Sequence, residues 1–190
     1  MSGLNFKTKP YAHQLKALEQ SYNKEYYAFF MEMGTGKSKV LIDEIANYYL
    51  EKKIDSAIII APKGVYRNWE RGEIPTHLSD DVPCSVATWK APSEMTKNDK
   101  QTLKDIVQPN GKLRIVLMNI EALSGSVGIK YATHFLHRNN TLLAVDESTT
   151  IKTPNAARTK NALKISKLAK FRRIMTGSPV TKNPLDVYSQ

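Results

Sequence analysis

The chain alternates short apolar runs with longer amphipathic stretches. Continuous runs of four or five apolar residues are typical of parallel strands that are buried on both faces of a sheet. A weaker run around residue 86 fits a strand at the margin of the same sheet. The pattern predicts strands at residues 26–30, 57–61, 85–87, 115–118, 141–145 and 173–175.

The stretches between these runs predict helices. A helix is expected from about Pro10, and residues 37–50 place Leu41, Ile45 and Tyr48 on one helical face. Strands that alternate with helices predict an α/β fold, in which a mostly parallel sheet lies between two layers of helices. Further helices are expected after Pro62, within the polar segment 92–108, over residues 122–138 with breaks near Gly125 and Gly128, and from Pro154 to about residue 170.

Polar residues follow several predicted strands directly. Right-handed crossovers place the carboxyl ends of parallel strands on the same edge of a sheet. Ligands of such sheets bind in the crevice beyond that edge. One edge is therefore expected to carry the chemistry, and the residues that meet there are 31–38, 62–63, 119, 146–147 and 176–177.

Residues 31–38, with the sequence MEMGTGKS, form a candidate phosphate-binding loop. The loop follows a predicted strand and opens a helix, as such a loop requires. Its glycines allow main-chain N–H groups to turn toward phosphate oxygens, and the helix N-terminus adds its positive dipole end. Lys37 would reach the terminal phosphates of ATP, and the Ser38 hydroxyl would bind Mg²⁺. The loop departs from the common pattern at Met31, where Gly or Ala is usual. The predicted ATP-binding residues of the loop are Met33, Gly34, Thr35, Gly36, Lys37 and Ser38.

A pair of carboxylates follows the strand predicted at residues 141–145. Asp146 would hold Mg²⁺, directly or through water, and Glu147 would orient and deprotonate the attacking water. Such a pair on its own is more often solvated at a strand end, but together with the loop it indicates nucleotide hydrolysis. The predicted catalytic residues are Glu147, Lys37 and Asp146, and the predicted cofactors are ATP and Mg²⁺.

Charge adds a candidate partner. The chain has 28 Lys and Arg against 18 Asp and Glu, for a formal net charge of +10. This balance indicates a polyanion such as nucleic acid, although an excess of surface lysine gives the same sum. Nine Lys or Arg and no acidic residue lie within residues 151–183. A phosphate-binding face and a merely solvated face are both open for Lys160, Lys164, Lys167 and Lys170.

Other protein classes are disfavoured by features that the sequence lacks. Cys84 is the only cysteine, so neither a disulfide framework nor a thiolate metal cluster is expected. Residues 1–7 lack the apolar core of a signal peptide, and no apolar run approaches the length of a membrane span. We therefore expect an intracellular setting, in the cytoplasm, nucleoid or nucleus, without a membrane partner.

Six segments in order resemble the motifs of the first RecA-like motor domain of superfamily two helicases, most closely those of the Swi/Snf-like DNA translocases. The resemblance runs from about Pro10 to the last residue. The match to motif I includes the Glu-Met-Gly of residues 32–34, and the Asn-Trp at 68–69 resembles the signature that follows motif Ia. The motifs are the Q motif at 10–14, motif I at 31–38, motif Ia at 58–63, motif Ib at 118–121, motif II at 146–149 and motif III at 176–179.

The resemblance implies roles that spacing alone does not assign. Gln14 would read the adenine edge. Trp69 could stack on a base, but an apolar residue in a packed helix is more often part of the core, and we interpret Trp69 as a core residue. Thr176, Gly177 and Ser178 would couple the ATP state to nucleic-acid binding. Contacts to the backbone phosphates of double-stranded DNA would come from Pro62, Lys63, Asn119 and Glu121.

The resemblance also implies a second RecA-like domain, which supplies the arginine finger and motifs IV to VI. The sequence stops at Gln190, inside the helix expected after motif III, and Arg172 and Arg173 do not match the finger. We therefore interpret residues 1–190 as a single N-terminal helicase ATP-binding domain, with the second RecA-like domain absent from this chain. We expect it to bind nucleotide weakly and to hydrolyse it poorly alone.

Motif II departs from the family pattern, because Ser148 and Thr149 stand where Ala-His or Ala-Asp is common. Hydrolysis needs only the two carboxylates, so the departure does not affect it. The departure concerns the contact by which the fourth residue of motif II couples hydrolysis to motion, and therefore the assignment to the Swi/Snf-like subgroup. Divergence of this size would suit a viral or mobile-element member.

The leading hypothesis is a motor that translocates on double-stranded DNA. A strand-separating helicase or restriction-type motor, on DNA or RNA, is a neighbouring hypothesis, and a nucleotide-dependent regulatory module without turnover belongs to another class.

Overall fold

The computed structural model describes residues 4–151, 153 and 155–178. Its centre is a six-stranded sheet in the order β1-β6-β5-β2-β4-β3, in which every neighbouring pair is parallel. All six predicted strands are present, most of them longer by one to three residues than the apolar run. They are β1 (Tyr26–Phe30), β2 (Ser56–Ala61), β3 (Cys84–Thr88), β4 (Leu113–Asn119), β5 (Thr141–Asp146) and β6 (Phe171–Thr176).

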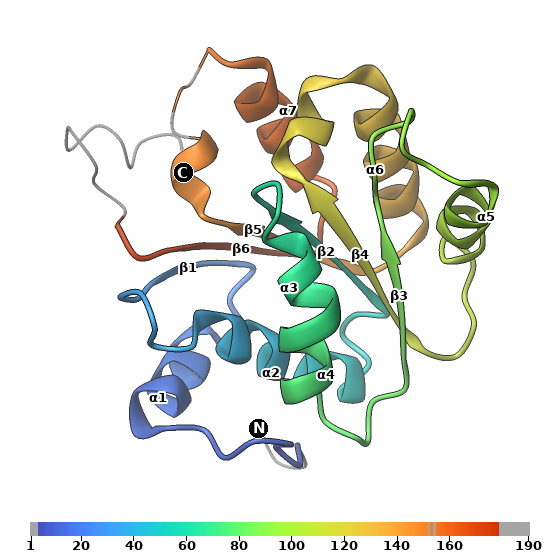
Figure 1. Cartoon of the computed structure of the whole chain (residues 1–190). Coiled ribbons are helices and arrows are strands. Elements are labelled where there is room, and N and C mark those ends of the chain that lie inside the picture. Colours follow the sequence, from blue (N-terminus) through green and yellow to red (C-terminus); the bar gives the residue numbers. More distant parts are fainter. Residues whose placement is uncertain (1–3, 152, 154, 179–190) are drawn as a thin grey trace.

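Helices cover both faces of the sheet, which confirms the predicted three-layer α/β fold (Figure 1). One face carries α1 (Ala12–Ser21), α2 (Lys37–Leu50) and the consecutive turns α3 (Tyr66–Asn68), η1 (Trp69–Glu73) and α4 (Ile74–His77). The other carries α5 (Lys97–Asp105), α6 (Ser126–Arg138) and α7 (Ala157–Ser166), with the short η2 (Ile120–Ser124) and η3 (Ser148–Ile151). Within the part of the chain that the structure describes, no helix has the length and apolarity needed to cross a bilayer.

Each strand contributes to two cores, because successive side chains of a strand point to opposite faces. Ala57 and Ile59 of β2 belong to the core beneath α2, and Ile58 and Ile60 belong to the core beneath α6 and α7. All six residues of β2 are buried. The absence of polar alternation in this run is therefore the direct consequence of a sheet covered on both sides.

Two predicted helix boundaries differ from the structure. The break expected near Gly125 and Gly128 is a single break, since Gly125 is the extended residue before α6 and Gly128 lies inside that helix. A Cβ on Gly128 would lie 2.3 Å from the Ala122 carbonyl oxygen, so glycine allows α6 to pack closely on η2. The last helix runs from Ala157 to Ser166, shorter than expected. Pro154, its expected first residue, lies outside the described residues, as does Pro179 of motif III.

A buried ion pair joins β6 to α2. The Arg173 guanidinium donates to both carboxylate oxygens of Glu44, from Nε at 2.7 Å and from Nη2 at 2.8 Å. The two side chains are 0% and 2% exposed. Arg173 Nη2 also donates to the carbonyl oxygens of Ser21 and Lys24. The pair therefore fixes the strand of motif III against the helix that begins with the candidate phosphate loop.

Candidate nucleotide and nucleic-acid site

The sheet order brings three of the predicted motifs together. β6 lies between β1 and β5, with Thr176 opposite Phe30 and Met175 opposite Asp146. The candidate phosphate loop leaves β1 at Met31, whose N–H donates to the Thr176 carbonyl oxygen at 3.3 Å. Thr176 is therefore placed between the loop and the carboxylates that end β5.

The candidate loop has the backbone that its glycines predict. Gly34 and Gly36 have φ angles of +77° and +80°, in the left-handed region that favours glycine. Gly36 precedes the first turn of α2, and no side chain caps that turn. The first N–H groups of α2 have no partner within the helix, so this end of the helix is suited to phosphate oxygens.

Lys37 is folded back onto its own loop. Its ammonium group donates to the carbonyl oxygens of Met31 at 2.9 Å and Glu32 at 3.0 Å. Thr35 closes the same turn through its N–H and its hydroxyl, which both donate to the Glu32 carbonyl oxygen. The Lys37 ammonium group therefore holds the loop in shape. Phosphate oxygens of a bound nucleotide would compete with these two carbonyl oxygens for it.

Gln14 supports the candidate loop from beneath. Its side chain is buried, its Nε2 donates to the Thr35 carbonyl oxygen at 3.0 Å, and its Oε1 accepts the Tyr11 N–H at 2.9 Å. A Cβ on Gly36 would lie 2.3 Å from Gln14 Nε2, so a side chain at this position would displace the Gln14 amide from the loop. The structure thus joins the Q motif to motif I, whereas adenine recognition by Gln14 stays a prediction.

A cavity of about 640 Å³ lies between the chain before α1 and the candidate loop. Gly34, Thr35 and Gly36 line one side, and Tyr11 and His13 line the other. The Tyr11 ring is 70% exposed and stacks on His13 with centroids 5.8 Å apart. An exposed aromatic pair next to a glycine-bearing helix start suits a planar base joined to phosphates, so these residues fit the adenine nucleotide that the sequence predicts.

Asp146 is held by two hydrogen bonds at the end of β5. Its Oδ2 accepts the indole N–H of Trp69 at 3.0 Å, and its Oδ1 accepts the main-chain N–H of Glu147 at 3.0 Å. Burial raises the pKa of the Asp146 carboxyl above its ordinary value, and the Trp69 hydrogen bond opposes that shift. The two hydrogen bonds therefore fix the orientation of the carboxylate.

Glu147 has a strained backbone and contacts motif III. Its φ of +50° lies in the left-handed region, which costs a non-glycine residue about 1–3 kcal/mol. The Thr176 hydroxyl donates to Glu147 Oε2 at 3.4 Å and accepts the Ser178 N–H at 3.2 Å. A Cβ on Gly177 would meet Met33 Cγ at 3.0 Å, so motif III also packs on the candidate loop. Thr176 thus contacts the predicted base, Thr176 and Gly177 contact the loop, and Ser178 holds the Thr176 hydroxyl.

The donor set at this edge fits Mg²⁺. Mg²⁺ in nucleotide sites is usually held by one or two carboxylates together with water and phosphate oxygens. Asp146 and Ser38, which begins α2 together with Lys37, would supply that carboxylate and a hydroxyl. Across residues 4–151, 153 and 155–178, no group of three or more His, Cys, Asp or Glu is arranged to hold a metal alone.

Trp69 is a site residue that the sequence interpretation missed. The indole is 1% exposed, which agrees with the expected core role, but its N–H reaches the carboxylate of Asp146 across 77 residues of chain. Trp69 opens η1, a wider π-type turn of the kind that is frequent near functional sites. The Asn-Trp signature after motif Ia was the available signal.

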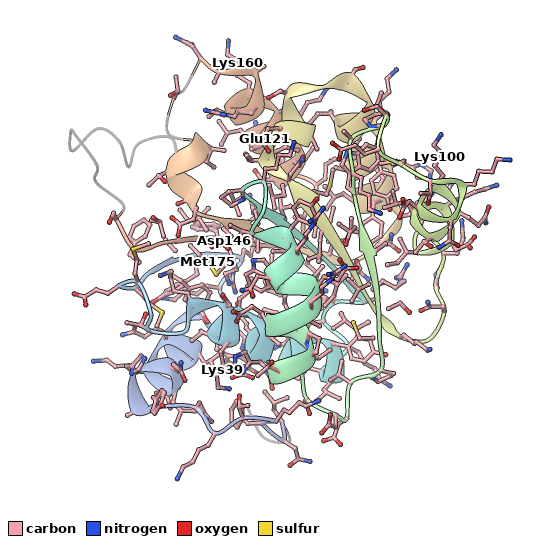
Figure 2. All side chains as sticks on the ribbon, in the orientation of Figure 1. Lys39, Lys100, Glu121, Asp146, Lys160 and Met175 are labelled. Carbon is pink, nitrogen blue, oxygen red and sulfur yellow. The ribbon has the colours of Figure 1, made fainter. Side chains whose placement is uncertain are left out.

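The residues predicted to contact nucleic acid continue the same edge beyond Asp146. β2 follows β5 and β4 follows β2, with Ala61 opposite Asn119. The side chains of Lys63 and Glu121 are exposed, and Figure 2 shows Glu121 beyond Asp146. The Asn119 side chain accepts the Ala122 N–H at 2.9 Å, so it also begins η2. The edge therefore runs from the candidate phosphate loop to the candidate nucleic-acid contacts.

The basic face of α7 adjoins this edge. The Asn161 side chain donates to the Leu123 carbonyl oxygen at 2.6 Å, which ties α7 to η2. Ala162 and Ile165 are buried, whereas Lys160 and Lys164 of α7 are exposed. Lys167 and Lys170 are also exposed, but they follow the helix, which ends at Ser166.

The fold and the arrangement of this edge define a RecA-like α/β domain. The family model described as SNF2-related domain matches residues 13–189. The chain therefore belongs to the SNF2-related domain family.

Similar proteins share either sequence or fold with this chain. The protein CHROMATIN REMODELING 24 of Arabidopsis thaliana is 27% identical in an alignment of 168 residues, and the match covers 83% of this chain but 14% of that protein. The Sulfolobus solfataricus SWI2/SNF2 ATPase core in complex with dsDNA is 19% identical with a TM-score of 0.70, over 100% of this chain and 36% of that one. The UvsW helicase from bacteriophage T4 is 14% identical with a TM-score of 0.65, over 96% and 57%. The chain thus spans a minor part of the first two relatives.

Proposed function

We propose that this domain is the ATP-binding half of a motor that hydrolyses ATP and translocates on double-stranded DNA. The observation that carries the proposal is the continuous sheet edge, on which hydrogen bonds link motif I, motif II and motif III. The SNF2-related membership supports an ATPase of helicase type. Double-stranded DNA as the track is supported by the Sulfolobus ATPase core, whose structure is a complex with dsDNA, and by the net charge of +10.

Each site residue then has a task. Bound Mg²⁺·ATP would supply the phosphoryl electrophile and the charge that stabilises its transfer. Gln14 and Tyr11 would contact the base, and the loop from Met33 to Ser38 would bind the phosphates. Lys37 would exchange its hydrogen bonds to the carbonyl oxygens of Met31 and Glu32 for bonds to phosphate oxygens. Glu147 would orient the attacking water and take its proton.

The domain would work with a second RecA-like domain that brings an arginine finger. Pro62, Lys63, Asn119 and Glu121 would hold the backbone of the duplex, and Thr176, Gly177 and Ser178 would report the state of the nucleotide to them. The protein would act inside the cell, in the cytoplasm, nucleoid or nucleus.

ATPase measurements test this function. Residues 1–190 joined to a second RecA-like domain are expected to show turnover that duplex DNA raises more than single-stranded DNA does. Greater stimulation by single strands would favour a strand-separating helicase. Turnover absent under every condition, with nucleotide binding intact, would point to a regulatory module and overturn the motor.

Removing the indole N–H of Trp69 is expected to weaken the use of Mg²⁺. Trp69→Phe keeps an aromatic ring in the core but leaves Asp146 Oδ2 without its donor. Partners that orient a metal-binding group typically affect metal affinity or activity by about 10- to 100-fold. The measurement is the Mg²⁺ concentration for half-maximal turnover, together with Mg²⁺-dependent binding of a fluorescent ATP analogue.

Trp89→Phe is the matched control, because Trp89 is the other tryptophan and is also buried, on the opposite face of the sheet. Equal Mg²⁺ dependence in the two variants would show that Trp69 only fills the core.

Charge reversal on α7 is expected to weaken duplex binding. Lys160→Glu combined with Lys164→Glu removes two exposed cations next to η2. Each lost phosphate contact lowers the slope of log affinity against log salt by about one. The measurement is duplex affinity at several salt concentrations.

The comparison variant combines Lys24→Glu with Lys112→Glu, at exposed positions before β1 and β4 on the opposite edge of the sheet. If both variants lose affinity alike, α7 is a solvated face and only net charge matters.

A further inference from the structure

A groove of about 500 Å³ lies between α5 and α6, at the β3 side of the sheet. Its floor is almost entirely apolar. The floor residues are Trp89, Met95, Leu103, Val107, Val127 and Tyr131. Val127 is 55% exposed although it is a large aliphatic residue. An exposed apolar surface with a defined shape is a feature of sites that bind other molecules.

The rim of this α5–α6 groove is cationic. Lys100 and Lys104 line it from α5, and His134 and Arg138 line it from α6. No Asp or Glu is among the described residues that line the groove. The two acidic residues of α5 have other partners. Asp99 accepts from Lys90 at 2.7 Å, and Asp105 accepts from Gln101 at 2.7 Å.

The two walls have the spacing of helix faces. Val127, Tyr131, His134 and Arg138 follow one another at intervals of four, three and four, so they form one stripe along α6. Lys100, Leu103, Lys104 and Val107 form a similar stripe on α5 and just beyond it. Two such stripes, which also supply four of the six floor residues, form the kind of groove in which a third helix binds.

The groove is already formed without an occupant. The Tyr131 hydroxyl donates to the Leu103 carbonyl oxygen at 2.9 Å, which fixes α6 against α5. The Trp89 ring packs beneath Tyr131 with centroids 5.0 Å apart. A rigid groove binds at a lower entropic cost than one that must be ordered by its ligand.

We propose that the α5–α6 groove binds an acidic amphipathic helix of a partner protein. The apolar face of that helix would cover the floor, and its Asp and Glu residues would face Lys100, Lys104 and Arg138, which gives charge complementarity. Nucleic acid is the poorer match, because backbone phosphates pair with cations and leave an apolar floor exposed to water.

The groove lies apart from the sheet edge that carries the proposed ATPase. Figure 2 shows Lys100 on α5 well away from Asp146. The helix-binding proposal therefore does not depend on the proposed function, and the chain of residues 1–190 is sufficient to test it.

Selection from a displayed library of random peptides tests the proposal. Residues 1–190 serve as the bait, and each recovered peptide is measured by fluorescence anisotropy. Recovered sequences are expected to share large apolar residues at i, i+3, i+4 and i+7 with Asp or Glu beside them. Their affinity should fall at least about tenfold when Lys100→Glu and Lys104→Glu are combined, because each reversed charge faces a carboxylate.

The matched control combines Lys97→Glu with Lys130→Glu. These exposed lysines lie on the same two helices, outside the groove, and their reversal should leave affinity within about twofold. Peptides that bind both variants equally, peptides without an acidic apolar pattern, or no enrichment at all would overturn the proposal. A short duplex that binds and competes at this groove, with the same loss in the Lys100 and Lys104 variant, would assign it to nucleic acid instead.

Discussion

A Glu147→Gln variant, joined to a second RecA-like domain, is expected to bind ATP normally and to lose about 10²- to 10⁴-fold in turnover. The amide is nearly the same size as the carboxylate, and its oxygen can still accept the Thr176 hydroxyl hydrogen bond. It cannot take a proton from the attacking water. The measurements are the maximal rate at saturating ATP and the affinity for a fluorescent ATP analogue.

Glu94→Gln is the control for this substitution, because Glu94 is exposed in the segment before α5. Its turnover should equal that of the unmodified protein. If Glu147→Gln keeps more than a tenth of the original turnover, another group accepts the proton. If ATP affinity falls as well, the Glu147 side chain helps to shape the nucleotide-binding site and is not only the acceptor of the water proton.

Arg173→Ala is expected to lower the free energy of unfolding by about 3–5 kcal/mol. The substitution leaves the Glu44 carboxylate buried without its cation and removes a donor from the carbonyl oxygens of Ser21 and Lys24. Domains of this kind are stable by about 5–15 kcal/mol, so the loss is a large fraction of the total. Urea unfolding followed by circular dichroism measures it.

Two further variants show whether the ion pair is the cause. Arg172→Ala, at the neighbouring position, removes a half-buried arginine that lies 3.6 Å from the exposed Glu25, and should cost less than about 1 kcal/mol. Combining Arg173→Met with Glu44→Met should restore part of the stability, since a buried pair can be replaced by apolar residues of similar volume. Equal destabilisation by all three variants would contradict the assignment.

The fold could be predicted from the sequence because burial imposes a local pattern. A parallel strand covered on both faces must be apolar at consecutive positions, and residues 58–60 of β2 show this directly. The shared edge follows from the parallel direction of the strands, so the placement of the loop, Asp146 and Thr176 on one edge of the sheet was predictable. The order of the strands was not, because pairing depends on contacts between segments far apart in the chain.

The roles of three residues show where sequence reasoning stopped. Trp69 has the composition of a core residue, and only its contact with Asp146 shows the second role. Arg173 was judged against the arginine finger alone, whereas its partner Glu44 lies 129 residues away. Gln14 was assigned to a ligand by resemblance, but in this structure its amide holds the main chain of the loop. In each case the decisive partner comes from another element, which local spacing does not reveal.

The position of β6 between β1 and β5 has a consequence for how this protein is made. β1 and β5 are formed by residues 26–30 and 141–146, yet the strand that joins them, at 171–176, is the last along the chain among the described strands. A nascent chain that stops before residue 171 leaves β1 without a sheet partner and one edge of β5 unpaired, and unpaired edges favour aggregation. Contacts of such long sequence separation also form slowly. The candidate nucleotide site is therefore completed only when β6 pairs with both β1 and β5.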